Sequence, residues 1–305
     1  MKVLGKPESS SDVVNGEPRV LLIGYGWVGQ YMGSYFKSAH YVTGDGIVRS
    51  QDGETVVLDT NLVDVSNLAT YDLAVIGVPT PMNHETGQCD TSIVEEAVNK
   101  YKGVVKYFLI KSTVEIGTCD RLAKKYGAKI GMSPEYVGET LGHPLLEPRR
   151  DGFQIIGGTD EETSMAIAGF FKLVLHASAP IHLCTATEAE IIKYCENYWI
   201  MERVDYWNDV QDIASTFKAS FDRIRTGLGL DPRFSLTHSF VYPNNRGWSG
   251  KCLPKDMNAL AFKMREMGRP MPVLEHLIVK NVAHWRKGYN NKEKLIPNNA
   301  SWSKK

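Results

Sequence analysis

The chain has 305 residues, of which 35 are acidic and 35 are basic, so its formal net charge is zero at pH 7. This balance argues against a dedicated nucleic-acid binder, and no apolar run approaches the roughly 20 residues that a membrane-spanning helix needs. The length predicts two domains, each large enough to bury a core.

The cysteines are scattered and lack CxxC spacing, which predicts a reducing, cytoplasmic setting and no metal site. They are five in number: Cys89, Cys119, Cys184, Cys195 and Cys252. Residues 1–17 are polar and contain no charged-then-apolar signal sequence, so we expect them to form a flexible tail.

An apolar strand from Arg19 to Ile23 runs straight into the glycine turn GYGWVG, and a helical pattern follows as far as Phe36. A dinucleotide-binding fold requires this order, because the glycines allow a tight turn, close approach of a pyrophosphate and close packing of helix on strand. The alternative is a glycine turn in some other α/β protein. The pattern predicts a dinucleotide site made by Gly24, Tyr25, Gly26, Trp27, Val28 and Gly29.

Asp45 lies about 20 residues after the first glycine and follows a second short strand pattern, HYVTG. An acid at this position accepts hydrogen bonds from the adenosine ribose, which favours NAD over NADP. A simple turn residue also fits Asp45.

Two nearly continuous apolar strands are expected at 73–78 and 107–111, as in the middle of a parallel sheet covered on both faces. Ligands of such sheets lie beyond the carboxyl ends of the strands, which places Val78, Pro79, Thr80 and Thr113 where a cofactor would sit. Each threonine fits a helix cap or turn equally well.

A further strand pattern near 128–132 leads into SPEYVGE, and the pattern at 154–158 predicts one more strand that closes the sheet. Glu135 and Glu139 stand four residues apart just after a strand end. Paired carboxylates can divide a proton-transfer task. The exposed start of a helix explains the spacing as well.

The stretch from Ala186 to Thr226 contains no Gly or Pro and has apolar residues at helical spacing, which predicts a long packed helix with one break allowed. Lys193 and Asn197 lie on one face of this helix, within reach of one ligand. A polar stripe on an amphipathic helix is the alternative reading. Another helical pattern covers 273–285, and a polar tail from 290 to 305 is expected to be flexible.

The predicted fold class is therefore α/β. A Rossmann-type dinucleotide-binding domain is expected at 18–185, and a second domain built on the long helix at 186–289.

Six motifs occur in one order: GYGWVG, VIGVPTP, IKSTVEIGT, SPEYVGE, EAEIIKYCEN and GWSGKCLPKD. From about Val20 to about Arg286 the chain resembles the UDP-glucose/GDP-mannose dehydrogenase family. The resemblance implies a homodimer in which 186–289 is the dimerisation domain and carries the cysteine loop. It also implies that the protein uses NAD to oxidise the primary alcohol of a nucleotide sugar, with UDP-glucose the first choice, to a carboxylate by two hydride transfers.

By this resemblance Cys252 is the nucleophile. A thiolate can trap the aldehyde as a thiohemiacetal, which loses the second hydride to give a thioester that water hydrolyses. Lys251 and Lys255 flank the thiol and would favour its ionised form. An isolated cysteine is more often a small buried hydrophobe, but the flanking glycines and the PKD sequence favour the catalytic reading.

The resemblance also implies roles for other residues. Lys193 and Asn197 would stabilise the oxyanion, and Glu139 would act as the base for thioester hydrolysis. Asp256 and Thr113 would position water or assist proton removal, with Glu135 in their network. Contacts to NAD are assigned to the glycine turn, Asp45, Val78, Pro79, Thr80, Thr113 and Glu139, and contacts to the sugar nucleotide to Glu135, Tyr136, Val137, Lys193, Asn197, Arg233, Gly247 and Cys252.

The chain also departs from the family pattern. Family members continue for another hundred or so residues as a domain that closes over the nucleotide, and Ser249 and Lys251 replace the usual glycine and small residue. Arg233 matches a family arginine that reaches the substrate across the dimer, and it also fits a surface position after a helix end. Two other functions remain open: a β-hydroxyacid-type NAD-dependent dehydrogenase, and a non-catalytic module that binds NAD or dimerises.

Overall fold

A computed structural model describes residues 18–36, 39–42, 47–50, 58–59, 70–136 and 152–285. Asp45, Val137, Glu139 and both terminal tails lie outside these ranges, so the predictions made for them stay predictions. The chain divides into two compact units. The first comprises Met1–Thr80 and Asp90–Ile192, and the second comprises Pro81–Cys89 and Lys193–Lys305.

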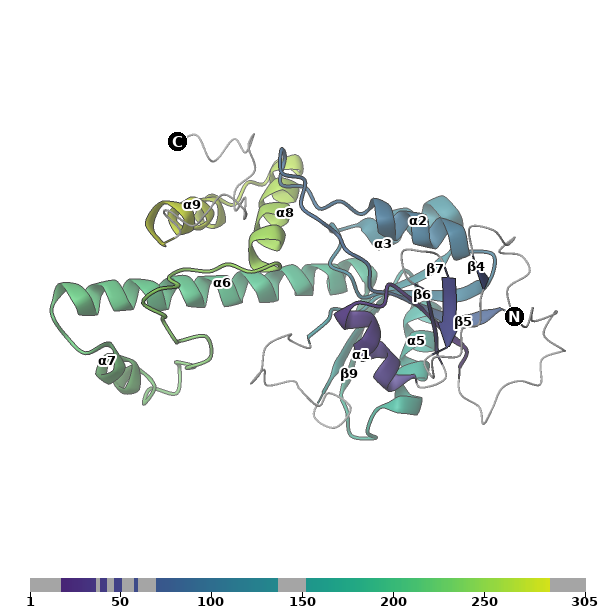
Figure 1. Ribbon diagram of the computed structural model, residues 1–305, viewed down its shortest axis with the longest axis horizontal. Coiled ribbons are helices and arrows are strands. Elements are labelled where there is room, and N and C mark those ends of the chain that lie inside the picture. Colours follow the sequence, from purple (N-terminus) through teal and green to yellow (C-terminus); the bar gives the residue numbers. More distant parts are fainter. Residues whose placement is uncertain are drawn as a thin grey trace. The chain divides into compact units, whose positions relative to one another are not determined.

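The first unit is built on one sheet (Figure 1). Its described strands follow the order β4-β3-β2-β1-β5-β6-β7-β8-β9. The central strands β2, β1, β5, β6 and β7 are parallel, β8 runs antiparallel to β7, and β9 is parallel to β8. The strands are β1 Val20–Ile23, β2 His40–Val42, β3 Ile47–Ser50, β4 Leu58–Asp59, β5 Tyr71–Ile76, β6 Val105–Ile110, β7 Lys129–Met132, β8 Gln154–Gly158 and β9 Ile181–Thr185. The predicted Rossmann-type α/β fold is confirmed.

Apolar cores cover both faces of this sheet, which explains why its central strands are almost uniformly apolar. Along β1, Leu21 and Ile23 enter one core, whereas Val20 and Leu22 enter the other. The first core also takes apolar residues from α2 and α3, and the second takes them from α1 and α5. These helices are α1 Trp27–Tyr35, α2 Ser92–Tyr101, α3 Thr118–Tyr126 and α5 Glu161–Val174.

The sheet extends further than the sequence pattern indicates. The strand expected to close it, β8, has β9 as its outer neighbour, paired from Gln154↔Ile181 to Gly158↔Thr185. His182 and Leu183 on β9 are exposed, so this strand lacks the continuous apolar signal of a central strand. The short strands β3 and β4 beyond β2 were also not predicted.

The second unit is organised around one long helix. α6 spans Ala186–Thr216, and α7, Phe221–Leu228, follows after an interruption, so the predicted long helix with one break is confirmed. At the break Lys218 has a positive φ of 52°, and Ser220 Oγ accepts a hydrogen bond from Arg223 N at 3.3 Å and so caps α7. α8 Leu253–Glu266, α9 Pro272–Lys280 and the π-helical turn η3 Asn281–Trp285 complete this unit.

The first turns of α6 are anchored in the first unit by a buried carboxylate. Glu190 accepts hydrogen bonds from Gly117 N at 2.5 Å and Cys119 N at 2.9 Å, at the start of α3. A helix N-terminus leaves such N–H groups without intrahelical partners and carries partial positive charge, so it suits a carboxylate. Burial nevertheless raises the pKa of Glu190, because the charged form loses its hydration.

None of the described helices is long and apolar enough to traverse a bilayer.

An ion-pair cluster between α2 and α3 generates a pH prediction. Arg121 and Lys125 hydrogen-bond to Glu95 and lower its pKa from the ordinary 4.5 to about 2. A depressed carboxyl pKa stabilises the fold above the unfolded-state value, and the stabilisation is lost as pH falls toward the folded-state value. Glu95→Gln should therefore lower the free energy of unfolding at pH 7, by about 1 kcal/mol or less because the pair is exposed. In urea titrations the difference should shrink below pH 4.5.

The neighbouring exposed Glu96 offers a control on the same helix, and Glu96→Gln should not show this trend. A difference for Glu95→Gln that stays constant from pH 7 to about pH 3 would contradict the assignment.

Candidate active site

The glycine turn has the geometry of a dinucleotide cradle. Gly24 has a φ of +87°, and a Cβ there would lie 2.7 Å from Gly77 O, while a Cβ on Gly29 would collide with Gly24 O. Gly26, the N-cap of α1, differs because a Cβ there would meet nothing within 4 Å. Two glycines are therefore required by close packing, and the third leaves open space at a helix N-terminus, where a pyrophosphate binds favourably.

The other residues of the turn lie in different environments. Tyr25 stacks on Tyr41 of β2 with ring centroids 3.8 Å apart, and Val28 is half-buried against the core. Trp27 is exposed at the start of α1. The structure confirms a turn at these residues, and the contacts of their side chains with a cofactor remain predictions.

At the carboxyl ends of β5 and β6, side-chain hydroxyls join the two following loops. Ser112 Oγ donates to Val78 O at 2.7 Å, and Thr80 Oγ1 donates to Thr113 O at 2.7 Å. Thr80 is buried and its hydroxyl has a structural partner, which favours the turn-residue interpretation for that side chain. Thr113 is half-buried at the same edge, and Pro79 is exposed.

Lys111, at the end of β6, is a buried cation that the sequence reading did not single out. Its Nζ donates to Ser133 Oγ at 3.2 Å and to Pro134 O at 3.0 Å, and it lies 3.5 Å from Glu135 Oε2. Glu135 also accepts from Tyr136 N at 2.9 Å. A lysine that ends a buried apolar strand requires a partner, so the YFLIK pattern did contain a signal for this pair.

In the second unit, a buried chain of polar groups connects α6 with α8. Asn197 Nδ2 donates to Asp256 Oδ2 at 2.5 Å, and Lys255 Nζ lies 2.6 Å from Asp256 Oδ1. Asp256 is fully buried, and Asn197 is 5% exposed. Burial alone would lower the pKa of Lys255, but the Asp256 carboxylate and the Cys89 and Cys252 sulfurs outweigh this effect and raise it.

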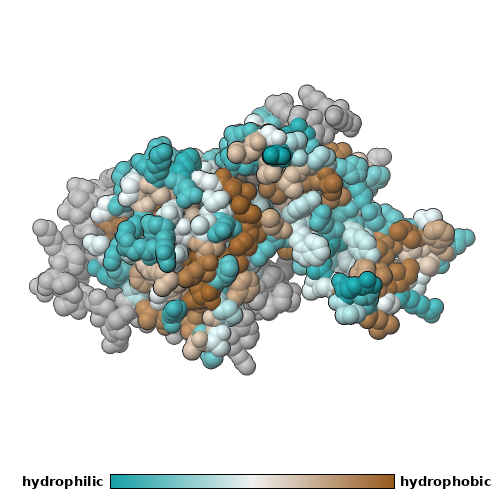
Figure 2. All heavy atoms as spheres, turned by 180° about the vertical axis from the view of Figure 1, so that it is seen from behind, coloured by the Kyte–Doolittle hydropathy of each residue, from teal (hydrophilic) through white to brown (hydrophobic). Residues whose placement is uncertain are grey.

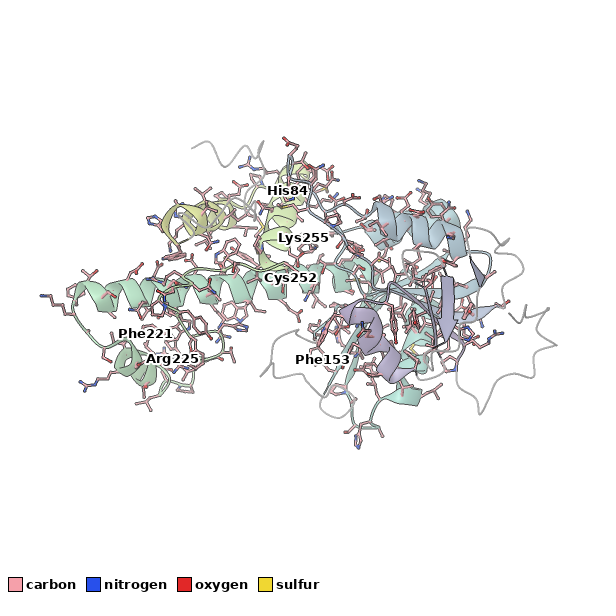
Figure 3. The ribbon with its side chains drawn as sticks, viewed as in Figure 1. His84, Phe153, Phe221, Arg225, Cys252 and Lys255 are labelled. Atoms are coloured by element: carbon pink, nitrogen blue, oxygen red, sulfur yellow. The ribbon has the colours of Figure 1, made fainter. Side chains whose placement is uncertain are left out.

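Cys252 is exposed at the N-cap of α8, one turn before Lys255 (Figure 3). The small-hydrophobe interpretation does not hold for this thiol, although it describes the fully buried Cys119. Lys251 is exposed, and Lys255 interacts electrostatically with the Cys252 sulfur. Lys193 is half-buried on α6, one turn before Asn197. Cys252 thus combines access with a nearby cation, as nucleophilic thiols require.

Cys89 is a second residue that sequence reasoning missed. Residues Pro81–Cys89 group with the second unit, and Met82 and Cys89 form an antiparallel bridge across the base of this loop, which His84 marks in Figure 3. The buried Cys89 sulfur interacts electrostatically with Lys255. No local pattern connects these two residues, because the interaction joins segments far apart in the sequence.

Arg233 lies at a different place in the second unit. Its exposed side chain pairs with Asp231 at 2.5 Å. It also lines a cavity of about 340 Å³ whose walls include Trp199, Tyr206, Trp207 and Phe234. Gly247, with a φ of +73°, lies in the segment that leads into Cys252.

Comparison with known families identifies the chain. Residues 52–174 match the NAD binding domain of the UDP-glucose/GDP-mannose dehydrogenase family, and residues 187–283 match the central domain of the same family. The chain belongs to the UDP-glucose/GDP-mannose dehydrogenase family. The first match begins after the glycine turn, so the assignment of that turn depends on its geometry. The family's NAD binding domain supports NAD as the cofactor, which confirms the sequence prediction, and the open backbone at Gly26 leaves room for its pyrophosphate.

Curated relatives carry related names. UDP-glucose 6-dehydrogenase TuaD of Bacillus subtilis is 28% identical over 248 residues, covering 75% of this chain and 51% of the relative. UDP-glucose 6-dehydrogenase of Pseudomonas aeruginosa is 25% identical over 252 residues, covering 78% and 54%. GDP-mannose 6-dehydrogenase of Azotobacter vinelandii is 22% identical over 248 residues, covering 76% and 55%. The chain therefore spans about half the length of these relatives.

Solved structures share the fold. A UDP-glucose dehydrogenase from Pyrobaculum islandicum superimposes with a TM-score of 0.70 at 22% identity, covering 88% of this chain and 68% of that one. A 3-hydroxyisobutyrate dehydrogenase from Mycobacterium tuberculosis gives 0.65 at 14% identity, covering 88% and 95%. The second comparison shows that almost the whole of a shorter dehydrogenase has the same fold.

The three glycines of the turn predict separable mutant effects. Gly26→Ala should leave the fold intact, because its Cβ enters open space, but should weaken NAD binding by about tenfold or more because it takes the room of a pyrophosphate. Gly29→Ala should lower thermal stability, because its Cβ collides with the Gly24 carbonyl. Calorimetric titration with NAD and thermal melts measure the two effects. Unchanged NAD affinity in a folded Gly26→Ala variant would contradict the assignment of the turn.

Proposed function

We propose that this chain is an NAD-dependent nucleotide-sugar dehydrogenase that oxidises the primary alcohol of its substrate to the uronic acid, with UDP-glucose the first candidate. The observation that carries the proposal is the exposed Cys252 beside the buried Asn197–Asp256–Lys255 chain. The names of the relatives, UDP-glucose 6-dehydrogenase and GDP-mannose 6-dehydrogenase, support the substrate class.

The first oxidation converts the alcohol to an aldehyde. NAD, when bound, supplies the hydride acceptor for this step and for the second oxidation. The hydroxyl proton leaves to a base through water, with Asp256, Thr113 and Glu135 as the groups that hold this water or assist the transfer. The Lys193 ammonium and the Asn197 amide stabilise the negative oxygen that develops on the substrate.

The second oxidation depends on the thiol. The Cys252 sulfur adds to the aldehyde carbon to form a thiohemiacetal, so the aldehyde does not escape between the two steps. Loss of a second hydride from that carbon gives a thioester. Water then breaks the C–S bond, releasing the carboxylate and restoring the thiol, with Glu139 as the base. The sum is two hydrides removed and one water consumed for each alcohol oxidised.

Other residues are proposed to hold the substrate and NAD. Tyr136, Val137 and Gly247 are expected to contact the sugar nucleotide, and Asp45 the adenosine ribose. Asp45, Val137 and Glu139 lie outside the described residues, so sequence alone supports their roles.

Replacing the proposed nucleophile provides a direct test. Cys252→Ser should lower uronic acid formation by at least about a hundredfold, because a hydroxyl is a far weaker nucleophile than a thiolate. The assay follows NADH absorbance and uronic acid with UDP-glucose, GDP-mannose and UDP-N-acetylmannosamine in turn. Cys195→Ser, at another exposed cysteine on α6, is the matched control and should stay close to the parent. A Cys252→Ser variant that forms uronic acid at the parent rate would rule out the thiol mechanism.

The same assay addresses the two other functions. Lys193 and Asn197 lie one turn apart on α6, an arrangement that also suits a β-hydroxyacid dehydrogenase, for which Cys252 is dispensable. That function predicts NADH formation with 3-hydroxy acids and full activity in Cys252→Ser. A non-catalytic module predicts NAD binding without NADH formation on any substrate.

We also infer that the chain forms a homodimer through α6. Trp199, Tyr206 and Ile213 are exposed large apolar side chains spaced by seven residues, which places them in one stripe, and the exposed Phe217 follows. Figure 2 shows apolar surface at the α7 end of the second unit. Such a stripe is typical of a helix that packs against another helix. Arg233, in the cavity beside Trp199, is proposed to reach the partner's substrate.

The dimer is tested by placing a charge in the stripe. Ile213→Glu should shift the protein toward the monomer in sedimentation velocity, raising the dissociation constant by about tenfold or more, because the interface would bury an unpaired carboxylate. Met165→Glu, at a comparably exposed apolar residue on α5, should leave the sedimentation coefficient unchanged. If both variants sediment like the parent dimer, α6 is not the interface.

A further inference from the structure

The segment that carries Cys252 is attached at both ends to one face of α6. Asn197 holds its far end through Asp256, and Asn208 holds its near end at Arg246 and Gly247. The two asparagines are three helical turns apart, about 16 Å along the axis, which returns them to the same face. A single rigid helix therefore fixes both ends of the Cys252 segment.

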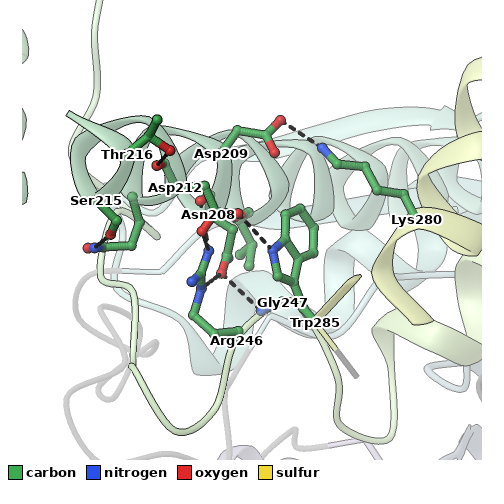
Figure 4. A network of polar contacts seen from close by, with 11 residues as sticks. Asn208, Asp209, Asp212, Ser215, Thr216, Arg246, Gly247, Lys280 and Trp285 are labelled. Carbon is green, nitrogen blue, oxygen red and sulfur yellow. Dashed lines mark hydrogen bonds and ion pairs between the residues drawn. The ribbon is translucent and has the colours of Figure 1, made fainter. Parts of the chain in front are cut away.

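Asn208 uses its side-chain oxygen for this segment (Figure 4). Its Oδ1 accepts from Gly247 N at 3.0 Å and from Arg246 Nε at 2.7 Å, while its Nδ2 donates to Val204 O at 2.7 Å within α6. The Arg246 guanidinium also donates to Asn208 O at 2.9 Å and to Asp212 Oδ1 at 2.7 Å. Every polar atom of the Asn208 side chain is thereby engaged, and Asn208 is 2% exposed.

Asn281, on η3, holds the next peptide unit. Its Oδ1 accepts from Trp248 N at 3.0 Å, and its Nδ2 donates to Trp248 O at 2.9 Å. Asn281 and Trp248 are both buried. Gly247 is required between the two asparagines, because its φ is +73° and a Cβ there would collide with Asn281 Oδ1.

The side-chain amides of Asn208 and Asn281 supply the hydrogen bonds that a helix or strand would otherwise give to this backbone. Gly247 and Trp248 belong to no helix or strand, yet backbone polar groups in a buried segment require partners. The two asparagines provide these partners from outside the segment, only a few residues before the sulfur. Reaction geometry is sensitive to displacement, since a shift of about 1 Å can lower a rate by about a hundredfold.

We propose that Asn208 and Asn281 are positioning residues that set the location of the Cys252 sulfur through the Gly247–Trp248 backbone. The inference rests on the proposed role of Cys252 as nucleophile. Neither asparagine needs to touch the substrate.

The test compares Asn208→Leu, which removes the acceptor, with Asn208→Asp, which keeps an acceptor for Gly247 N and Arg246. Asn208→Asp loses only the donor to Val204 O, which lies within α6 and outside the segment. Asp209→Asn is the matched control, because Asp209 is the next residue and pairs with Lys280 rather than with the segment. Asn208→Leu should lose amide-exchange protection in a peptide covering 246–252 and lower kcat by about tenfold to a hundredfold, with KM for NAD unchanged. Asn208→Asp should recover most of the protection and of kcat, and Asp209→Asn should match the parent.

Asn281→Asp provides an independent variant if Asn208→Leu fails to fold. Its carboxylate can still accept from Trp248 N but repels Trp248 O, so the same loss of exchange protection and of kcat is expected. Unchanged protection of 246–252 in a folded Asn208→Leu or Asn281→Asp variant would overturn the proposal. Lost protection with parental kcat would overturn it as well, because the segment would then be loosened without effect on the thiol.

Failure of the proposed function gives a different result. A parent that forms no NADH with any nucleotide sugar contradicts the dehydrogenase proposal, and positioning is then judged on the rate at which iodoacetamide alkylates Cys252. A change of more than about threefold in Asn208→Leu, absent from Asp209→Asn, supports positioning, because a displaced sulfur meets the reagent differently. Equal rates overturn it.

Discussion

The hydrogen bond from Asn197 to the buried carboxylate of Asp256 is the interaction on which the candidate site depends. A carboxylate excluded from water is strongly destabilising unless other groups replace its hydration. Here an amide N–H at 2.5 Å and the Lys255 ammonium at 2.6 Å do so. Because Asp256 lies in the first turn of α8 and Asn197 on α6, this pair fixes the helix start that presents Cys252 to the helix that carries Lys193.

Several features of the molecule follow from the length and continuity of α6. Its middle holds Asp256 and Gly247 of the segment that carries Cys252, and its exposed apolar stripe is the face proposed for dimerisation. Groups on separate loops would need separate anchors, whereas groups on one helix keep their spacing as long as the helix is intact. The long run without Gly or Pro therefore keeps the spacing of the groups that hold the Cys252 segment.

The sequence predicts those features whose signals are local. The apolar strands, the glycine turn and the long helix each lie within one short stretch, and the structure confirms them. Strand β9 was not predicted, because its exposed side chains and its direct junction with α6 hide the strand pattern. Three contacts were not predicted, because each joins residues 24 to 166 positions apart and spacing along the chain does not reveal them. They are Lys111 with Glu135, Cys89 with Lys255, and Asn208 with Gly247. Asp45 and Glu139 still depend on the motif alone.

In the proposed mechanism, the sulfur of Cys252 becomes covalently attached to the carbon that is oxidised. Acid-quenching the Glu139→Gln variant during turnover with NAD and UDP-glucose, followed by peptide mass spectrometry, tests this most directly, because slowed hydrolysis should let the thioester accumulate. The peptide that contains Cys252 is expected to gain the mass of the nucleotide uronyl group. Uronic acid production with that peptide unmodified, or with the adduct on another residue, would contradict it.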